Sequence, residues 1–389
     1  MFAASPALRT WFLLAASAPL LHCGARTGLA GTTGDASSSV DAGSSVDAVS
    51  LEDGGLPEAA PACMPAPPAG RTIGSFPEET IAMSVAVVGD TVYAATTSIS
   101  SASPLYTGAI ASVPAAGGPT VPLSAPQYNF GTLVTDGARL YYAPSSGMPT
   151  GPNGAIYTIL GVAAIDLATG TAHSITTTAP PWSTSSQIDA TMIAATTAWP
   201  GVFWIGGTAG SDAASTLSAW DSRSDTVTTL ATGESLSGVA VDDTRVYWAD
   251  VGTGAGITVY SAPLGGGAAT TLATVPGGTH GVLLGVSDAD VVFVTDYAAG
   301  TIDAVSKTGG TPRLLVTAAA AWVNDFAWVD DTDLYWTEVA TPTTLKRVPV
   351  AGGTPAVVPT QGEIQSLAFD ACNIYVGTYG PAQVMVMPR

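Results

Sequence analysis

An imidazole and three carboxylates are the side chains of this sequence best suited to hydrolytic or metal chemistry. They are His280, Asp189, Asp325 and Glu363. Brought together, one imidazole and several carboxylates can bind a divalent cation or transfer a proton. We expect no cofactor, but if the chain holds a divalent cation, Asp189, Asp325 and Glu363 are the expected ligands.

Other catalytic motifs give little support to an enzyme. The sequence has no Gly-x-Ser-x-Gly element, which argues against a lipase or another α/β-hydrolase. Gly252, Gly254 and Gly256 match part of a dinucleotide fingerprint, but we expect no helix after them to receive a pyrophosphate. His173 lies in a Thr-rich stretch, where we expect it to be solvated. No zinc spacing is present.

The elements that must position these residues belong to a repeat. Each unit has an apolar strand, an acidic turn, an apolar-aromatic strand, a Gly-rich hairpin and a Thr/Val-rich strand. One aromatic residue in the second strand marks each unit: Tyr93, Tyr141, Phe203, Tyr247, Phe293, Tyr335 and Tyr375. Successive marks are 48, 62, 44, 46, 42 and 40 residues apart. Periods near 40 to 45 residues with four short strands predict the blades of an all-β, seven-bladed β-propeller.

Two other features keep the same register. An Asp lies five residues before the mark in five units, at Asp136, Asp242, Asp288, Asp330 and Asp370. Glycine pairs follow downstream, at Gly117-Gly118, Gly265-Gly266, Gly309-Gly310 and Gly352-Gly353. Asp favours the first position of a β-turn, and Gly supplies the positive φ of a tight hairpin. We therefore interpret these acids as turn formers and not as calcium ligands.

The last unit is short of one strand. It ends near Val384–Met387, which we predict as its third strand, and the segment Arg71–Phe76 has the character of a closing fourth strand. Borrowing that strand from the N-terminal side closes the ring and removes free sheet edges. Cys63 precedes the borrowed strand and Cys372 lies in the first turn of the last blade, so we predict a disulfide between them in an oxidising compartment.

The N-terminal region predicts export and a tether. Arg9 is followed by an apolar run of eleven residues, Trp11–Leu21, which is too short to span a bilayer and is typical of a secretory signal. The sequence Leu20–Cys23 (LLHC) resembles the lipobox of bacterial lipoproteins, which implies a signal peptide over residues 1–22 and a lipid on Cys23. The alternative is an ordinary secretory signal cleaved nearby. Residues 23–70 are rich in Ala, Ser, Gly and Pro and should be a disordered tether, leaving residues 71–389 for the propeller.

Charge narrows the class of partner. The net charge is −19, and only 11% of the residues are charged. Such a chain repels phosphate backbones and anionic lipid headgroups, so we expect neither nucleic acid binding nor peripheral membrane binding. We expect a monomer in the bacterial cell envelope, attached to a membrane only through its lipid, on the periplasmic face or at the cell surface.

The second strands resemble those of YWTD-type propellers. The resemblance rests on Val246–Asp250 (VYWAD), Leu334–Glu338 (LYWTE) and Val292–Asp296 (VFVTD), and more loosely the chain is similar to NHL and gluconolactonase-like propellers. It implies a rigid binding or scaffolding body. Because YWTD propellers typically have six blades, six is the alternative blade count. Gluconolactonase-like propellers hold calcium at the mouth of the central channel, which implies a calcium-dependent hydrolase or lactonase as the alternative function.

Residues at the start of each innermost strand should line that mouth. They are Tyr128, Asn129, Trp182, Asp189, Ser237, His280, Trp322, Asn324, Asp325, Glu363 and Gln365. One interpretation is a polar funnel with an aromatic rim that suits a glycan or a peptide, since Trp and Tyr combine a flat apolar face with a polar edge. The other is that these residues only hydrate the channel and cap the blade junctions. The function we expect from the sequence is non-catalytic binding of a glycan, peptide or envelope partner.

Overall fold

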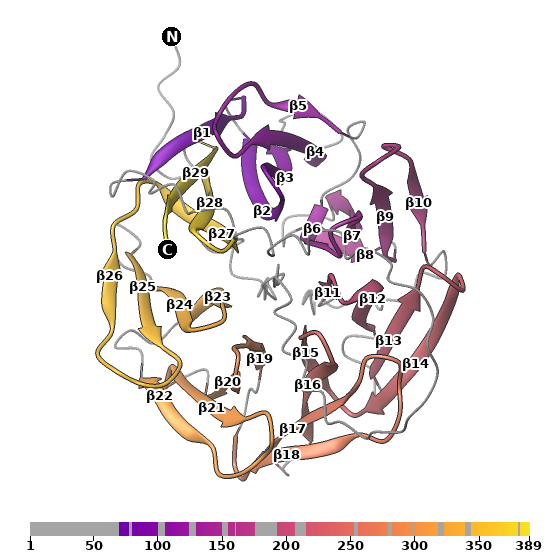
Figure 1. The fold of residues 1–389 in the computed structure, drawn as a ribbon, viewed down its shortest axis with the longest axis vertical. Coiled ribbons are helices and arrows are strands. Elements are labelled where there is room, and N and C mark those ends of the chain that lie inside the picture. The colour runs from indigo at the N-terminus through magenta and orange to yellow at the C-terminus, as the bar shows by residue number, and fades with distance from the viewer. Residues whose placement is uncertain are drawn as a thin grey trace, which may run out of the picture.

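The computed structural model shows a seven-bladed β-propeller, with seven antiparallel sheets arranged around one central axis (Figure 1). It describes residues 70–77, 80–99, 106–123, 130–149, 155–159, 161–175, 193–206, 215–252, 256–278, 282–296, 299–317, 323–338, 344–379 and 382–389. The all-β class and the count of seven blades are therefore confirmed. In this described part no helix is long and apolar enough to cross a membrane.

Each blade runs from an innermost strand outward. Blade 1 is β2 (Thr80–Val88), β3 (Thr91–Ile99), β4 (Tyr106–Pro114) and β5 (Val121–Pro122). Blade 2 is β6 (Phe130–Thr135), β7 (Arg139–Pro149), β9 (Ala163–Asp166) and β10 (Ala172–Ser174), with β8 (Ala155–Ile159) also paired to β7. Blade 3 is β11 (Ile193–Thr196), β12 (Trp199–Gly206), β13 (Ser215–Asp221) and β14 (Thr226–Gly233).

The remaining blades follow the same order. Blade 4 is β15 (Leu236–Val241), β16 (Arg245–Gly252), β17 (Gly256–Pro263) and β18 (Thr270–Val275). Blade 5 is β19 (Val282–Val286), β20 (Asp290–Asp296), β21 (Thr301–Ser306) and β22 (Arg313–Thr317). Blade 6 is β23 (Val323–Val329), β24 (Asp333–Glu338), β25 (Thr344–Pro349) and β26 (Ala356–Val358). Blade 7 is β27 (Glu363–Phe369), β28 (Asn373–Tyr379), β29 (Gln383–Pro388) and the N-terminal strand β1 (Arg71–Ser75).

The 62-residue interval between Tyr141 and Phe203 contains an added hairpin. Strand β7 continues beyond its pairing with β9, and its last five residues, Ser145–Pro149, pair with β8. An extra strand pair, and not a misplaced register mark, accounts for part of the long interval.

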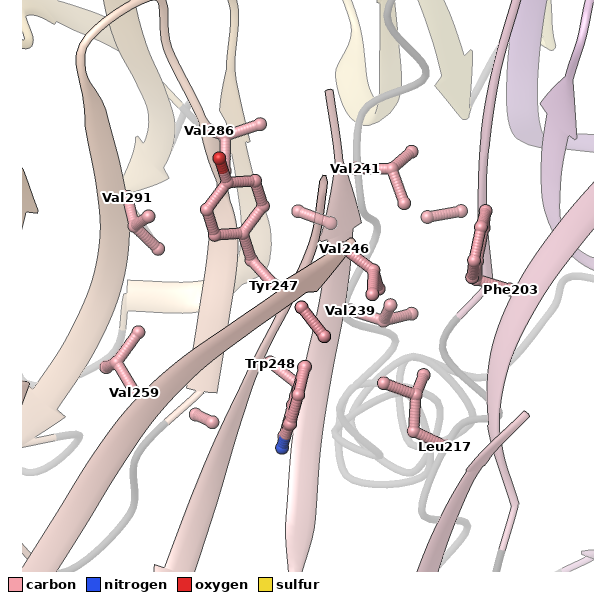
Figure 2. Packing of buried hydrophobic residues seen from close by; sticks show 14 of the residues in the cluster. Phe203, Leu217, Val239, Val241, Val246, Tyr247, Trp248, Val259, Val286 and Val291 are labelled. Carbon is pink, nitrogen blue, oxygen red and sulfur yellow. The ribbon is translucent and has the colours of Figure 1, made fainter. Parts of the chain in front are cut away.

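The core consists of apolar layers between neighbouring blades. Alternate residues of each strand point to opposite faces of a sheet, so a four-stranded blade can bury both faces against its neighbours. Figure 2 shows such packing on both faces of blade 4, with Phe203 of blade 3 on one side and Tyr247 of blade 4 beside Val291 of blade 5 on the other, all three in one buried cluster. The second strands are buried almost throughout, which explains why their sequences are the easiest to recognise.

Four of the five recurring acids are turn formers, as predicted, and three of them also bond the tyrosine of the next strand. In blade 2, Asp136 Oδ1 accepts hydrogen bonds from the backbone NH groups of Ala138 (2.9 Å) and Arg139 (2.8 Å). Its Oδ2 accepts a 2.6 Å bond from the hydroxyl of the register mark Tyr141. Blades 4 and 7 repeat the Asp–Tyr bond, from Tyr247 to Asp242 and from Tyr375 to Asp370, each at 2.7 Å. One carboxylate thus caps the turn and orients the strand that follows.

Blade 6 keeps the capped turn but not the Asp–Tyr bond. Asp330 Oδ1 accepts from the backbone NH groups of Thr332 and Asp333, while its Oδ2 pairs with Arg389 Nε at 2.8 Å. The buried hydroxyl of Tyr335 has no hydrogen-bond partner among the described residues. Burial raises the pKa of this phenol well above its ordinary value, and nearby Arg347 offsets the effect only in part.

Two register predictions were wrong by one residue. In blade 4 the register mark Tyr247 pairs with a residue of β17. The equivalent residue of β21 in blade 5 pairs with Val292 and not with Phe293, so Val292 is the register mark of blade 5. Ser287 therefore takes the turn position that we assigned to Asp288, and its Oγ accepts from the backbone NH of Asp290 at 3.1 Å. In blade 4 the positive φ angles fall on Gly266 (87°) and Gly267 (135°), one residue later than predicted.

The ring closes by strand exchange, as predicted. Strand β1 pairs with β29, and the two ends of the described chain meet in blade 7 (Figure 1). Beside this ladder the backbone NH of Phe76 donates to the carbonyl of Ala382 at 3.1 Å, and Arg71 Nη1 donates to the carbonyl of Ala116 at 2.7 Å. Closure leaves the propeller with no unpaired blade.

Polar contacts join every neighbouring pair of blades. Going round the ring from blades 1 and 2, the contacts are Leu133 N to Ser84 Oγ (3.0 Å), Arg139 Nη1 to Ser222 Oγ (3.1 Å), Leu236 N to Ser215 Oγ (2.6 Å), Lys307 Nζ to Asp242 Oδ2 (2.8 Å), Asp288 N to Asp331 O (3.0 Å), Arg389 Nε to Asp330 Oδ2 (2.8 Å) and Gly118 N to Ile73 O (3.2 Å). Burial alone would raise the pKa of Asp242, but Lys307 and Tyr247 together bring it well below its usual value. These acids and bases serve the framework.

We predict that Tyr-to-Phe substitutions at two equivalent register marks change the free energy of unfolding by very different amounts. Tyr141→Phe removes the hydrogen bond that the tyrosine hydroxyl donates to the buried Oδ2 of Asp136 and should lower the free energy of unfolding by about 1.5–3 kcal/mol. Tyr335→Phe removes a hydroxyl that has no partner among the described residues and should stay within about 0.5 kcal/mol of wild type. Urea unfolding of both variants checks this, and equal losses would contradict it.

Candidate functional site

The structure describes only part of the predicted channel mouth. Six of the predicted residues lie outside the described residues: Tyr128, Asn129, Trp182, Asp189, His280 and Trp322. Asn324 and Asp325 belong to the innermost strand β23, but their side chains are not described. Ser237, Glu363 and Gln365 are described, on the innermost strands β15 and β27. The site can therefore be built only from these last three and from their neighbours.

Glu363 is the first residue of β27, at the end of blade 7 where the chain enters the innermost strand. Its side chain is exposed, yet surrounding protein desolvates the carboxyl group and raises its pKa above the usual glutamate value. This combination is expected beside a channel, where water reaches a group that the protein still partly surrounds. No described residue forms an ion pair or hydrogen bond with this carboxylate. It contrasts with the carboxylates of Asp136, Asp242, Asp330 and Asp370, which all have partners.

The innermost strands are interrupted by register shifts against their second strands. In β27 the register against β28 shifts between Ile364 and Ser366, which leaves Gln365 as the extra residue. In β15 the same kind of shift lies between Ser237 and Val239. The other five innermost strands also shift against their second strands. A bulge bends a strand and increases its twist, so it re-aims the residues before it. Gln365 and Ser237 are half-buried at these bends.

Sequence reasoning missed Tyr379 as a member of the site. It ends β28 directly opposite Glu363, and 37% of its surface is exposed, a high value for a large ring. Directly opposed residues of an antiparallel pair have their side chains on the same face, with Cβ atoms about 4.5–5.5 Å apart. An aromatic residue directly after the buried stretch of a second strand was the available signal.

The described residues do not form a metal site. Among them no group of three or more His, Cys, Asp or Glu side chains is arranged to hold a metal ion. Of the three predicted calcium ligands only the side chain of Glu363 is described, so the predicted set of Asp189, Asp325 and Glu363 stays a prediction. His173 lies in the exposed outer strand β10, as expected, 5.6 Å from the ring of Trp220. Gly252 and Gly256 flank a hairpin between β16 and β17, with no helix.

The three cysteines are also only partly described. Cys372 lies in the turn between β27 and β28, where its backbone NH donates to Asp370 Oδ1 at 2.7 Å. Cys23 and Cys63 lie outside the described residues. The predicted lipid attachment and the predicted disulfide therefore stay predictions.

Comparison with known proteins supports the fold alone. No protein-family model and no curated protein matches the sequence. The structure is similar to the acylaminoacyl peptidase of Pyrococcus horikoshii, with a TM-score of 0.55 and 10% identity over 80% of this chain and 52% of that chain. This chain thus spans about half of the peptidase's length.

Two further structures align over most of their own length. The β-propeller domain of the Trilobed protease from Pyrococcus furiosus has a TM-score of 0.53 and 10% identity over 80% of this chain and 94% of that domain. An oligogalacturonate lyase solved in complex with manganese has a TM-score of 0.51 and 11% identity over 84% of this chain and 98% of that chain. The protease domain is described as having an open velcro topology, whereas here β1 pairs with β29. The chain is a seven-bladed β-propeller, and its structural relatives differ in activity.

We predict that Glu363→Gln stabilises the protein at neutral pH. Because the carboxyl pKa is higher in the folded state than in the unfolded chain, deprotonation costs stability as the pH rises from about 4 through the folded pKa. The gain at pH 7 should be at most about 0.5 kcal/mol, since the group is exposed and screened, and it should vanish below about pH 4. Thermal unfolding across this pH range measures it.

The Asp166→Asn variant is a control, because its stability should change in the opposite direction. Hydrogen bonds from the backbone NH and hydroxyl of Thr169 lower the pKa of Asp166, so Asp166→Asn should reduce stability above about pH 4. A Glu363→Gln variant that is less stable than wild type at pH 7 would contradict the prediction.

Proposed function

We propose that this chain is a non-catalytic binding or scaffold lipoprotein of the bacterial cell envelope, which contacts a glycan, peptide or envelope partner at the channel mouth. The observation that carries the proposal is Glu363, a partly desolvated carboxylate with no partner among the described residues. We expect the ionised carboxylate of Glu363 to lower the stability of the fold. This favours a role in function, because residues at functional sites are often less stabilising than other residues would be at the same positions. Gln365, Ser237 and Tyr379 add amide, hydroxyl and aromatic groups at the same end of the blades.

The opposite end of the blades has a different use. Its acids and bases cap turns and join neighbouring blades, as Asp242 and Lys307 do at 2.8 Å. Side chains that already satisfy one another are less suited to recognising a ligand, because binding would have to break their existing bonds. The division of roles between the two ends supports contact at the mouth.

The anchor and the disulfide belong to the same proposal. Lipid on Cys23 would hold the chain at a membrane, with residues 24–70 as the tether that we predict from composition. A Cys63–Cys372 bridge would fix the segment before β1 to the blade that β1 completes. Both require the exported, oxidising location that the N-terminal sequence predicts.

One observation favours a second candidate function, a calcium-dependent hydrolase or lactonase. A carboxyl group whose pKa is raised by desolvation has the property of a general acid, and Glu363 shows this shift. The manganese complex of the oligogalacturonate lyase shows that a propeller of similar fold can bind a metal.

Thermal unfolding of the intact chain with calcium or with chelator distinguishes the two candidates. We predict no shift with 1 mM calcium and no esterase or lactonase turnover that depends on Glu363. A site of micromolar affinity would instead add about 4 kcal/mol of stability at that concentration. Such a gain, with turnover lost in Glu363→Gln or Asp325→Ala, would overturn the binding proposal in favour of the enzyme.

Intact mass spectrometry of the chain purified from a bacterial membrane fraction tests the anchor and the bridge together. We predict a mass that corresponds to residues 23–389 with lipid on the N-terminal cysteine, and no alkylation of Cys63 or Cys372 without reduction. Cys23→Ser should move the protein from the membrane to the soluble fraction. A soluble wild-type protein, or free alkylation of both remaining cysteines, would contradict the corresponding part of the proposal.

A further inference from the structure

Glu363 and Tyr379 share one face of blade 7. They are directly opposed in the β27–β28 ladder, so their side chains project on the same side. Two residues earlier in β28, a Cβ added at Gly377 would lie 3.0 Å from the carbonyl of Ala82 in blade 1. Because side chains alternate along a strand, Tyr379 faces the same side as Gly377, toward blade 1. The pair therefore lies on the blade 7 side of the junction with blade 1.

The neighbouring residues agree with this placement. Tyr375 packs in the apolar layer with Val85 and Val92 of blade 1, while Ile364 packs in the opposite layer with Tyr335 of blade 6. Glu363 is adjacent to Ile364 and thus points away from blade 6. The backbone bond from Phe76 to Ala382 fixes the chain beside this edge.

A cation fits this pair better than a neutral ligand does. The carboxylate has no partner among the described residues, and charge-assisted hydrogen bonds are about twice as strong as neutral ones. An exposed tyrosine ring attracts cations through its negative face. A guanidinium group combines both properties, since it is planar, donates two parallel hydrogen bonds to a carboxylate and stacks on aromatic rings. The net charge of −19 favours the approach of a basic partner.

We propose that Glu363 and Tyr379 bind the guanidinium group of an arginine in a basic peptide segment of the partner. The inference rests on the proposed binding function and specifies the class of its ligand. Glu363 pairs with the guanidinium, and Tyr379, directly opposite in the ladder, covers its flat face.

Saturation-transfer NMR on the intact chain tests the inference with acetyl-arginine N-methylamide as the probe. Its neutral isostere, acetyl-citrulline N-methylamide, has the same shape without the charge. We expect the arginine probe to bind at least tenfold more tightly than the citrulline probe. Glu363→Gln should reduce arginine binding to the citrulline level, Tyr379→Ala should weaken it about threefold to tenfold, and Tyr379→Phe should keep it.

Asp90→Asn is the matched control, because Asp90 is an exposed carboxylate in the β2–β3 turn, at the opposite end of blade 1. It should bind the arginine probe as wild type does. Equal binding of the two probes, no binding of the arginine probe, or an equal loss in Asp90→Asn and Glu363→Gln would overturn the arginine site.

Binding tests with a panel of neutral peptides and oligosaccharides distinguish a wrong arginine site from a wrong proposed function. If a neutral compound binds and Glu363→Gln weakens its binding, the proposed function stands and only the arginine class is wrong. If no compound binds in a way that depends on Glu363, both are wrong.

Discussion

The pairing of β1 with β29 is the constraint on which the rest of this molecule depends. It turns a row of seven blades into a ring, so that each sheet is covered on both faces by a neighbour. Strand β1 precedes blade 1 in the sequence but belongs to blade 7. The backbone hydrogen bond from Phe76 to Ala382 lies where the chain passes from β1 towards blade 1. Glu363 and Tyr379 lie at this same junction of blades 7 and 1. Closure therefore shapes the edge where we place ligand recognition.

The two ends of the blades use polar residues differently. At one end, acids such as Asp136 and Asp370 cap turns and hold the tyrosine of the next strand, and other polar groups connect adjacent blades. These bonds stabilise a fold whose short strands contribute little individually. At the other end, β27 is bulged near its start, and Glu363 is left without a partner among the described residues. A rigid ring can thus present an unpaired carboxylate without losing its framework.

The repeat made the fold predictable from sequence, since an apolar second strand and an Asp-capped turn recur through most units. Periodicity placed six of the seven register marks correctly. It placed the mark of blade 5 one residue late, at Phe293, because the register of β20 shifts just before Asp296. This shift moves Asp296, the acidic end of the motif that we aligned, one residue further along the strand. The site was less predictable. Sequence analysis proposed Glu363 and Gln365 as candidates, but the position of Tyr379 opposite Glu363 depends on cross-strand register, which no local pattern reveals.

Hydrogen exchange of the intact chain, followed by mass spectrometry, tests the closed ring most directly. If β1 is an integral strand of blade 7, the backbone amides of β1 and β29 should exchange in the same slow class as those of β28, because all three open only when the ring unfolds. Fast exchange of β1, with β29 exposed as a free edge while β28 stays protected, would contradict closure. It would also remove the fixed junction on which the placement of Glu363 and Tyr379 depends.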